Sequence, residues 1–292
     1  MVLIAISGSG ALLPLLSAIQ HGKDIALANK ESLVMAGDIV MEIASMRKVK
    51  IIPIDSEQSA IWQCLEHEDR SRLRTIYLTA SGGPFRTMSA AALKKVSVSR
   101  VLRHPRWKMG RKITVDSATM MNKGLELLEA MSLFGVTSDR VKVVVHPEAV
   151  VHSMVEFVDG VVMAQLSVTD MRIPIQYALT YPERLENKLT RLDFRKSGAL
   201  HFEKPDFKRF PCLALAYRAA EESGTMPAVM NAANEVSVEE FLKKDIGFTD
   251  IAKVIEMVME VHRKKTRPSL DQILEADSWA RREAYRMIAR MN

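Results

Sequence analysis

Residues 25–57 read IALANKESLVMAGDIVMEIASMRKVKIIPIDSE, and this stretch decides the fold class. Its two largely apolar runs, Ile25–Ala28 and Lys50–Ile54, have the length of buried strands, and each gives way abruptly to polar residues. Between them, residues 30–45 place apolar side chains at the three- and four-residue spacing of a helix. A strand, a helix and a second strand in this order predict a parallel or mixed sheet covered by helices, as in an α/β protein.

The same alternation continues along the chain. Asp159-Gly160 separates the runs Val155–Val158 and Val161–Ser167 and predicts a β-hairpin, because Asp-Gly favours the positive φ angles of a tight turn. The stretch 185–211 is polar and irregular, and the helical spacing beyond it predicts a C-terminal helical bundle. Further strands are predicted at Val2–Ile6, Thr75–Thr79, Lys112–Val115 and Lys142–Val145. Further helices are predicted at Ala11–Gln20, Ser59–Glu66, Thr119–Phe134, Cys212–Glu222, Pro227–Leu242, Thr249–Val261 and Ser269–Met291.

The composition is that of a globular protein. The chain has 292 residues, 48% of them hydrophobic and 26% charged, which is enough for two domains with their own cores. No run of 18 apolar residues exists, and the apolar start lacks a basic region and is interrupted by Ser7-Gly8-Ser9-Gly10, so we expect neither a membrane span nor a signal peptide. Cys64 and Cys212 lie far apart without metal-ligand spacing, which fits structural packing in a reducing compartment. We therefore expect a cytoplasmic protein without a membrane partner.

Positive charge is concentrated in the middle of the chain. The net charge is +6, but eleven Lys or Arg residues lie between Arg72 and Lys112, and no Asp or Glu occurs from Ser71 to Val115. Such a local field favours a phosphate or another small anion as the ligand. Nucleic acid is a weaker interpretation, and none is expected, because Trp107 and two flanking aromatic residues offer little stacking surface.

Two acidic residues follow the strand predicted at Lys50–Ile54. If the strand geometry persists, Asp55 and Glu57 project to the same side, because side chains alternate along a strand. Two carboxylates so placed could bind a hard divalent cation and leave positions open for a substrate. The alternative is that Asp55 or Ser56 caps the next helix and that Glu57 is solvated.

A second polar stretch runs from a predicted strand into a predicted helix. In that helix Asn122 and Glu126 lie one turn apart on one face. Lys123 beside them offers a charge to a phosphate, and Ser117 offers a hydroxyl at the helix start. The alternative is an ordinary capped helix with a polar face, although Gly124 inside it would cost about 1 kcal/mol relative to Ala.

Three further segments carry polar groups whose role has two interpretations. Ser81-Gly82-Gly83-Pro84 offers converging backbone amides to an anion, or is simply a turn. The segment His104–Gly110, which contains a Trp, is either a lid that closes over a ligand or a structural loop. Asn29–Ser32 stands at the edge of a sheet where ligands bind, or forms a helix cap. His146 and His152 show no metal spacing and are interpreted as structural.

Taken together, these segments resemble one family, the 1-deoxy-D-xylulose 5-phosphate reductoisomerases. The resemblance covers essentially the whole chain, and the ordered set is far more specific than any single motif in it. It implies an NADPH-dependent, metal-assisted enzyme that isomerises and reduces deoxyxylulose phosphate to 2-C-methyl-D-erythritol 4-phosphate for isoprenoid synthesis, and we expect a homodimer. The motifs that carry the resemblance are Ala28–Ser32, Ile54–Glu57, Ser81–Phe85, His104-Pro105, Trp107, Met109-Gly110, Val115–Glu126, His146-Pro147, His152–Met154, Asp170–Arg172 and Asn231–Glu235.

Residue by residue, the resemblance implies a metal site, a substrate site and part of a cofactor site. Asp55, Glu57 and Glu126 match the ligands of a divalent cation, Mg²⁺ or Mn²⁺. The positions that match contacts to NADPH are Asn29, Glu31 and Gly110, and those that match the family's closing flap are Trp107 and Met109. The positions that match the sugar-phosphate site are Lys30, Ser56, Glu57, Ser81, His104, Ser117, Asn122, Lys123 and Glu126. The resemblance implies that the catalytic groups among them are Glu57, His104, Lys123 and Glu126.

The sequence departs from the family pattern at its start. The family begins with a Rossmann-like NADPH domain that carries a Gly-rich fingerprint, of which on the order of a hundred residues have no counterpart here. Ser7-Gly8-Ser9-Gly10 does not replace the fingerprint, because Leu13 stands where a third glycine is needed. The resemblance then divides the chain into a remnant of the NADPH-binding domain (1–25), a catalytic metal and substrate domain (26–184), a linker (185–211) and a C-terminal helical domain (212–292). We expect such a chain to bind substrate and metal more firmly than NADPH.

Two other functions are open at this point. One is a non-catalytic phosphosugar-binding chain that has lost its nucleotide domain. The other is a metal-dependent phosphosugar hydrolase or aldolase. Oxidation of NADPH that depends on deoxyxylulose phosphate separates the reductoisomerase from both, and release of phosphate identifies a hydrolase.

Overall fold

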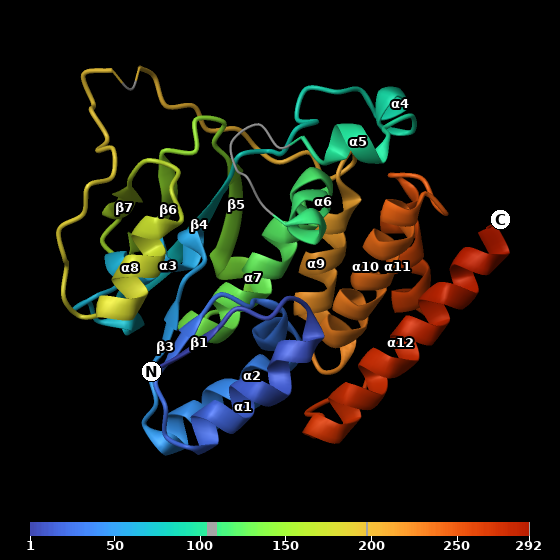
Figure 1. The fold of residues 1–292 in the computed structure, drawn as a ribbon, viewed down its shortest axis with the longest axis horizontal. Coiled ribbons are helices and arrows are strands. Elements are labelled where there is room, and N and C mark those ends of the chain that lie inside the picture. Colours follow the sequence, from blue (N-terminus) through green and yellow to red (C-terminus); the bar gives the residue numbers. More distant parts are fainter. Residues whose placement is uncertain (104–109, 197, 292) are drawn as a thin grey trace. The chain divides into compact units, whose positions relative to one another are not determined.

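The computed structural model describes residues 1–103, 110–196 and 198–291, coloured along the sequence in Figure 1. These residues form two compact units. The first comprises residues 1–33, 37–81 and 129–205, and the second comprises residues 34–36, 82–128 and those from 206 onward. The functional division of the chain that the resemblance implies is separate from this division by packing, and it stays a prediction.

The first unit begins with a parallel sheet of three short strands in the order β1-β2-β3. β1 (Val2–Ile4) pairs with β2 (Ile25–Leu27), which pairs with β3 (Ile51–Pro53). The strands are connected by α1 (Leu12–Gln20) and α2 (Glu31–Arg47), and β2 and β3 are buried along their whole length. The strands predicted here are confirmed, and each ends one or two residues earlier than expected.

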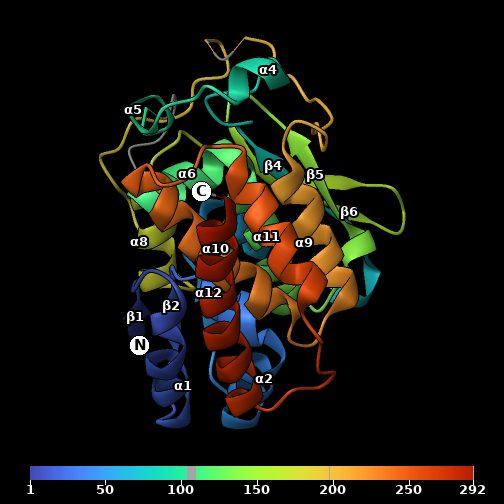
Figure 2. The ribbon, with the colours of Figure 1, turned by 90° about the vertical axis from the view of Figure 1, so that its right-hand side faces the viewer.

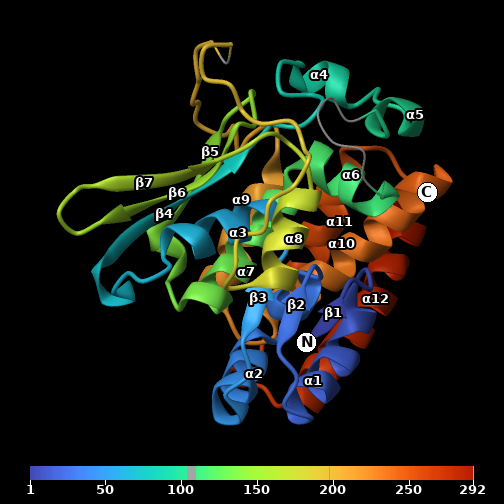
Figure 3. The ribbon, with the colours of Figure 1, turned by 60° about the vertical axis from the view of Figure 1, so that its left-hand side comes forward.

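The second sheet of this unit is mixed, with four strands in the order β5-β4-β6-β7. Its strand β4 (Leu73–Ala80) runs parallel to β5 (Val141–Val145) and antiparallel to β6 (Val151–Phe157). β7 (Val162–Leu166) lies at the edge and pairs with β6 in the long hairpin visible in Figure 3. Together the two sheets confirm the predicted α/β fold class.

The turn between β6 and β7 forms at the predicted Asp159-Gly160 pair. The amide of Phe157 donates to the carbonyl oxygen of Val161 at 2.9 Å, so three residues form the loop. Gly160 has a φ of +86° and Asp159 does not have a positive φ. Instead, the Asp159 carboxylate accepts the amide of Val161 at 3.0 Å. The hairpin is confirmed, but its turn is a three-residue loop that ends in a left-handed glycine.

A hydrophobic cluster in the first unit fixes the turn that follows β3. Ile52 and Ala178 are among its buried residues, and the partly buried side chain of Trp62 packs against it. Trp62 belongs to α3 (Ser56–Cys64), which contacts β6 and β7, and Ala178 belongs to α8 (Arg172–Thr180). The acidic residues after β3 are therefore anchored by packed elements on both sides.

The second unit is helical (Figure 2). Its elements are α4 (Ala90–Leu93), α5 (Val98–Val101), α6 (Arg111–Thr119), the first part of α7 (Met121–Phe134), α9 (Pro211–Glu222), α10 (Met226–Lys243), α11 (Asp250–Val261) and α12 (Leu270–Met291). α10 contacts α9, α11 and α12 and is buried around most of its circumference, which makes it the centre of a bundle. The predicted C-terminal bundle is confirmed. Within the described ranges, no helix is both long and apolar enough to cross a membrane.

The segment between α8 and α9 is irregular, as predicted for 185–211. The described residues 185–196 and 198–210 contain no regular helix or strand. An isolated bridge joins Glu203 to Val145 of β5, with two backbone hydrogen bonds of 2.8 Å. This bridge ties the irregular segment to the mixed sheet of its own unit.

The strand predicted at Lys112–Val115 is wrong, because these residues lie in α6. Their β-branched side chains favour a strand, but local contacts stabilise the helix. The Thr114 hydroxyl donates to the backbone carbonyl one turn earlier at 2.8 Å, and Lys112 pairs with Asp116 one turn later at 2.9 Å. Val115 is fully buried in the helical unit, where α6 contacts α9 and α10. Tertiary packing overrides the intrinsic propensity of this short run.

Gly124 lets α7 and α9 approach closely, so packing accounts for this glycine. A Cβ atom at Gly124 would lie 2.4 Å from the Cβ of Ala216. Inside a helix, Gly→Ala normally stabilises by about 1 kcal/mol. Here we expect Gly124→Ala to lower the free energy of unfolding by about 1–3 kcal/mol through overpacking, as measured by denaturant titration. Adding Ala216→Gly should recover part of the loss, and a Gly124→Ala variant as stable as the unsubstituted chain would contradict the prediction.

Candidate active site

The polar turn after β3 begins a helix instead of continuing the strand. β3 ends at Pro53, Asp55 occupies the N-cap position and Glu57 lies in the first turn of α3. The strand therefore does not persist as assumed, but carboxylate oxygens of Asp55 and Glu57 still lie within 4.8 Å of each other, so the two acids do point to the same side. The strand ends here because the chain must reverse into α3, which packs against β6 and β7. Asp55 has the backbone position of a cap, but its side chain makes no capping hydrogen bond.

Lys30 and Asp55 form a buried ion pair at the carboxyl ends of β2 and β3. Nζ of Lys30 lies 2.5 Å from Oδ2 of Asp55, and the two side chains are 7% and 14% exposed. Parallel neighbours end at the same edge of a sheet, so residues from two separate turns meet there. On the next turn, the Ser56 hydroxyl donates to the Glu57 carboxylate. The predicted gathering of polar groups at this sheet edge is confirmed for Lys30 and Asp55.

Asn29 connects the loop after β1 to the start of α2 through side-chain hydrogen bonds. Its Nδ2 donates to the carbonyl oxygens of Ile6 and Gly8 at 2.8 and 3.0 Å. Its Oδ1 accepts the backbone amide of Ser32 at 2.9 Å, and Nδ2 lies 2.9 Å from a Glu31 carboxylate oxygen. These bonds favour the helix-cap interpretation of the segment. A contact of Asn29 or Glu31 with NADPH stays a prediction.

In the second unit, Ser117 lies near the end of α6, not at a helix start as predicted. Residues 111–119 form a helix of their own, so the start expected near Thr119 is the junction between α6 and α7. Gly83, with a φ of +68°, packs against this turn so closely that a Cβ atom there would lie 2.7 Å from the carbonyl oxygen of Ser117. The Gly82-Gly83 turn is therefore required by backbone conformation and by close packing. Anion binding by Ser81 and these amides stays a prediction.

The first two turns of α7 group three of the predicted site residues. Nδ2 of Asn122 donates to Oε1 of Glu126 at 2.6 Å, and Nζ of Lys123 donates to Oε2 of the same carboxylate. Glu126 is fully buried, and Lys123 is 4% exposed. The helix face predicted from the spacing of Asn122 and Glu126 is confirmed. The arrangement holds one buried anionic group between a cation and an amide.

Two further residues of the second unit, Asp116 and Asn234, lie next to the predicted site residue Ser117 or contact its neighbour. The sequence patterns assigned no role to either of them. Asp116, 1% exposed, precedes Ser117 in α6 and accepts a hydrogen bond of 2.9 Å from Asn234 of α10. Lys112 pairs with the other carboxylate oxygen at 2.9 Å. The Asn231–Glu235 motif, noted only as part of the resemblance, was the available signal for Asn234.

His146, His152 and the two cysteines make structural contacts, as predicted. His146 is fully buried, its Nδ1 lies 2.8 Å from the His201 carbonyl oxygen, and its ring stacks on Phe202. Nε2 of His152 lies 3.2 Å from a backbone carbonyl oxygen. The two cysteines are free and buried, and burial raises the pKa of both thiols, that of Cys64 to about 11.

The predicted flap falls on residues that the structure does not describe. His104, Trp107 and Met109 lie outside the described residues, so the predictions for them are untested. Gly110, at the end of this segment, occupies the N-cap position of α6. Its carbonyl oxygen accepts the amide and the hydroxyl of Thr114 at 3.1 and 2.8 Å.

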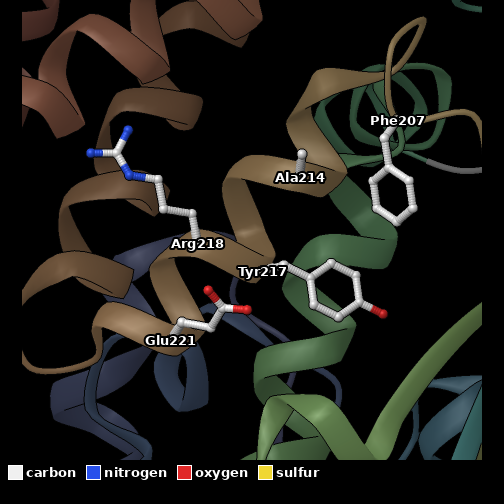
Figure 4. A pocket seen from close by; sticks show the side chains of 5 residues that line it. All are labelled: Phe207, Ala214, Tyr217, Arg218 and Glu221. Atoms are coloured by element: carbon white, nitrogen blue, oxygen red, sulfur yellow. The ribbon is translucent and has the colours of Figure 1, made fainter.

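A hollow of about 330 Å³ lies along α9, away in sequence from the predicted site residues (Figure 4). The rings of Phe207 and Tyr217 meet edge to face with centroids 6.0 Å apart. Arg218 pairs with Glu222 at 2.7 Å. The hollow contains none of the residues predicted for substrate, metal or cofactor, and Ala214 and Glu221 complete its lining.

Known proteins match the chain along nearly its whole length. Residues 51–134, 166–283 and 1–37 match, respectively, the family models "1-deoxy-D-xylulose 5-phosphate reductoisomerase C-terminal domain", "DXP reductoisomerase C-terminal domain" and "1-deoxy-D-xylulose 5-phosphate reductoisomerase". The reductoisomerase of Pelotomaculum thermopropionicum is 52% identical over 288 residues, which cover 99% of this chain and 74% of the relative. The chain belongs to the 1-deoxy-D-xylulose 5-phosphate reductoisomerase family. The reductoisomerase of Endomicrobium trichonymphae is 54% identical over the same shares of both chains.

Solved 1-deoxy-D-xylulose 5-phosphate reductoisomerases have the same fold. The Zymomonas mobilis enzyme in complex with NADPH matches with a TM-score of 0.91 at 45% identity, over 98% of this chain and 74% of that one. A reductoisomerase in complex with NADPH, fosmidomycin and magnesium also gives 0.91, at 42% identity and with 98% and 75% covered. The family resemblance drawn from the motifs is thereby confirmed. Which residues of this chain hold ligand, metal and cofactor stays a prediction.

Proposed function

We propose that this chain carries the substrate- and metal-binding machinery of a 1-deoxy-D-xylulose 5-phosphate reductoisomerase. The reaction is the NADPH-dependent isomerisation and reduction of deoxyxylulose phosphate to 2-C-methyl-D-erythritol 4-phosphate in non-mevalonate isoprenoid synthesis. One observation carries the proposal: Glu126 is fully buried between Asn122 and Lys123 in a chain that is 52% identical to a reductoisomerase over 99% of its length. A solved relative binds NADPH, fosmidomycin and magnesium, and the proposal extends this ligand set to the chain.

The proposed metal ligands are Asp55, Glu57 and Glu126. Three carboxylates are hard oxygen donors of the kind that Mg²⁺ and Mn²⁺ prefer, so the donor set fits either cation. When bound, the cation would stabilise negative charge on the neighbouring carbonyl and hydroxyl oxygens of the ketose. Lys30 pairs with Asp55, and Lys123 pairs with Glu126, so each of these two acids is held in place by a lysine.

The proposed phosphosugar site uses donors from both strand ends and helix turns. Lys123 and Asn122 offer charged and amide N–H groups, and Ser117 offers a hydroxyl, which are the donor types that phosphate oxygens accept. The acid-free segment 72–115 adds a positive field. The remaining proposed substrate contacts are Lys30, Ser56, Glu57, Ser81, Glu126 and His104, the last outside the described residues. The proposed catalytic groups are Glu57, His104, Lys123 and Glu126.

The proposed contacts to NADPH are Asn29, Glu31 and Gly110. Asn29 and Glu31 are held by the hydrogen bonds that start α2, so their positions are fixed before a cofactor arrives. Gly110 starts α6. When bound, NADPH would supply the hydride for the reduction.

The proposal includes a homodimer in the cytoplasm. β7 forms an edge of the mixed sheet, and Val161 just before it and Val162 and Met163 within it are 53%, 50% and 38% exposed. An edge strand with exposed apolar side chains is a natural contact for a second copy. The two free cysteines support a reducing compartment.

We expect Val162→Lys to shift the mass measured by light scattering from dimer to monomer, and an unchanged dimer would contradict an interface at β7.

An activity assay tests the proposed function. The chain is assayed alone and joined to the NADPH-binding domain of a family member, with Mg²⁺ and deoxyxylulose phosphate, while NADPH absorbance and free phosphate are recorded together. We expect the joined protein to oxidise NADPH only when the ketose phosphate is present and to release no phosphate. Substrate binding without NADPH oxidation would indicate a phosphosugar-binding protein, and release of phosphate would indicate a hydrolase.

A further inference from the structure

A buried pair, Asp116 of α6 and Asn234 of α10, adjoins the proposed phosphate-binding residues of the same unit. Nδ2 of Asn234 donates to Oδ1 of Asp116 at 2.9 Å, and Lys112 pairs with Oδ2 at 2.9 Å. Asp116 is 1% exposed and Asn234 is fully buried. A buried carboxylate is tolerated where partners satisfy its oxygens. Each oxygen of this carboxylate therefore has its own partner, Asn234 for Oδ1 and Lys112 for Oδ2.

The same residue controls the junction between α6 and α7. The Thr119 hydroxyl donates to the backbone carbonyl of Asp116 at 3.2 Å and accepts the amide of Met121 at 3.3 Å. Met120 between them has a φ of +63°, so α6 ends and α7 begins within one left-handed residue. The direction of the first turn of α7 thus depends on how α6 is held at Asp116.

The chemistry of residue 234 indicates that its Nδ2 group, which donates to Asp116, is the part that matters. Oδ1 of Asn234 is buried without a hydrogen-bond partner among the described residues, a cost that an apolar side chain would avoid. An aspartate there would set a second carboxylate against Asp116. An amide is the side chain that brings a neutral N–H group from α10 to the buried carboxylate.

We propose that Asn234 is a positioning residue for the sugar phosphate. By holding Asp116 it fixes α6 and the junction, so that Ser117, Asn122 and Lys123 meet the phosphate in one arrangement. This inference rests on the proposed function. The turn that carries Ser117 has little room to adjust, because its carbonyl oxygen is packed against Gly83.

The test compares Asn234→Leu with a matched control, Asn231→Leu. Asn231 lies one turn earlier on α10, is also fully buried, has an unpartnered Oδ1 among the described residues, and donates to Glu235 at 3.1 Å instead of to Asp116. Calorimetry with deoxyxylulose phosphate and Mg²⁺ gives the Kd, and thermal melting gives the stability. We expect both variants to melt earlier, but only Asn234→Leu to weaken substrate binding, by about 10- to 100-fold.

Exchanging the carboxylate and the amide between positions 116 and 234 shows whether a loss of substrate binding comes from lost positioning or from a general loss of structure. Asp116→Asn and Asn234→Asp each remove the complementary pair, and the double variant restores one amide and one carboxylate across α6 and α10. We expect the Kd of the double variant to recover most of the loss, while a double variant that folds but does not bind contradicts the proposal.

Each remaining outcome is informative. Unchanged Kd in Asn234→Leu, or an equal rise in Asn231→Leu, overturns this inference alone. Absence of binding by the unsubstituted chain overturns the proposed function and this inference with it.

Discussion

The Glu126→Gln variant is expected to lose at least about 100-fold in Mn²⁺ affinity, measured by calorimetry in the presence of substrate. The substitution keeps the volume of the side chain and removes the charge of one of three proposed carboxylate ligands. Glu126 is fully buried, so solvent does not replace the missing charge. The loss is therefore expected to be larger than for an exposed acid.

Glu129→Gln is the matched control for this experiment. Glu129 lies three residues later on α7 and is also fully buried, but it is not among the proposed metal ligands. Removing its charge should leave the affinity for Mn²⁺ unchanged. Equal losses in the two variants, or no loss in Glu126→Gln, would remove Glu126 from the metal site.

The Lys123→Met variant is expected to be strongly destabilised without metal and partly rescued by Mg²⁺. Lys123 pairs with Glu126, and both side chains are at most 5% exposed. Breaking a buried pair by removing one partner costs about 3–5 kcal/mol, because an uncompensated charge stays behind. A bound cation would compensate that charge in place of the lysine. Denaturant unfolding in a chelator and in Mg²⁺ should therefore show a larger metal effect in the variant than in the unsubstituted chain.

Lys112→Met provides the comparison. It breaks another pair with a buried acid, that of Lys112 with Asp116, which is 1% exposed. Because Asp116 is not a proposed metal ligand, Mg²⁺ should not rescue this variant. The same Mg²⁺ response in Lys112→Met and Lys123→Met would show that the cation does not act at Glu126.

Local patterns predicted most of the fold. They failed where an apolar run was too short to show whether its spacing was that of a strand or of a helix. The run Ile25–Ala28 is bounded by polar residues, and its residues Ile25–Leu27 are all buried, so its strand could be predicted. Asp159-Gly160 marked its hairpin because the backbone there needs a glycine with positive φ. Lys112–Val115 spans barely one helical turn, and its β-branched side chains suited a strand. The burial of Val115 in the helical unit, which no local pattern encodes, decided its structure.

The candidate site divides in the same way between local and long-range information. The face shared by Asn122 and Glu126 follows from a spacing of four residues, and it was predicted. The Lys30–Asp55 pair follows from the parallel ends of two neighbouring strands. The Asp116–Asn234 pair joins residues 118 positions apart, and each alone reads as an ordinary polar residue of a helix. Its contact becomes visible only when α6 and α10 are packed together.

We infer that this chain binds a phosphorylated ketose with the help of a divalent cation. Calorimetric titration of deoxyxylulose phosphate into the 292-residue chain, once with Mg²⁺ and once with excess chelator, tests it most directly. We expect saturable binding with Mg²⁺ and at least about tenfold weaker binding with chelator, since the cation and the phosphate-binding donors act on the same ligand. Absence of binding with Mg²⁺, or the same Kd in both titrations, would contradict it.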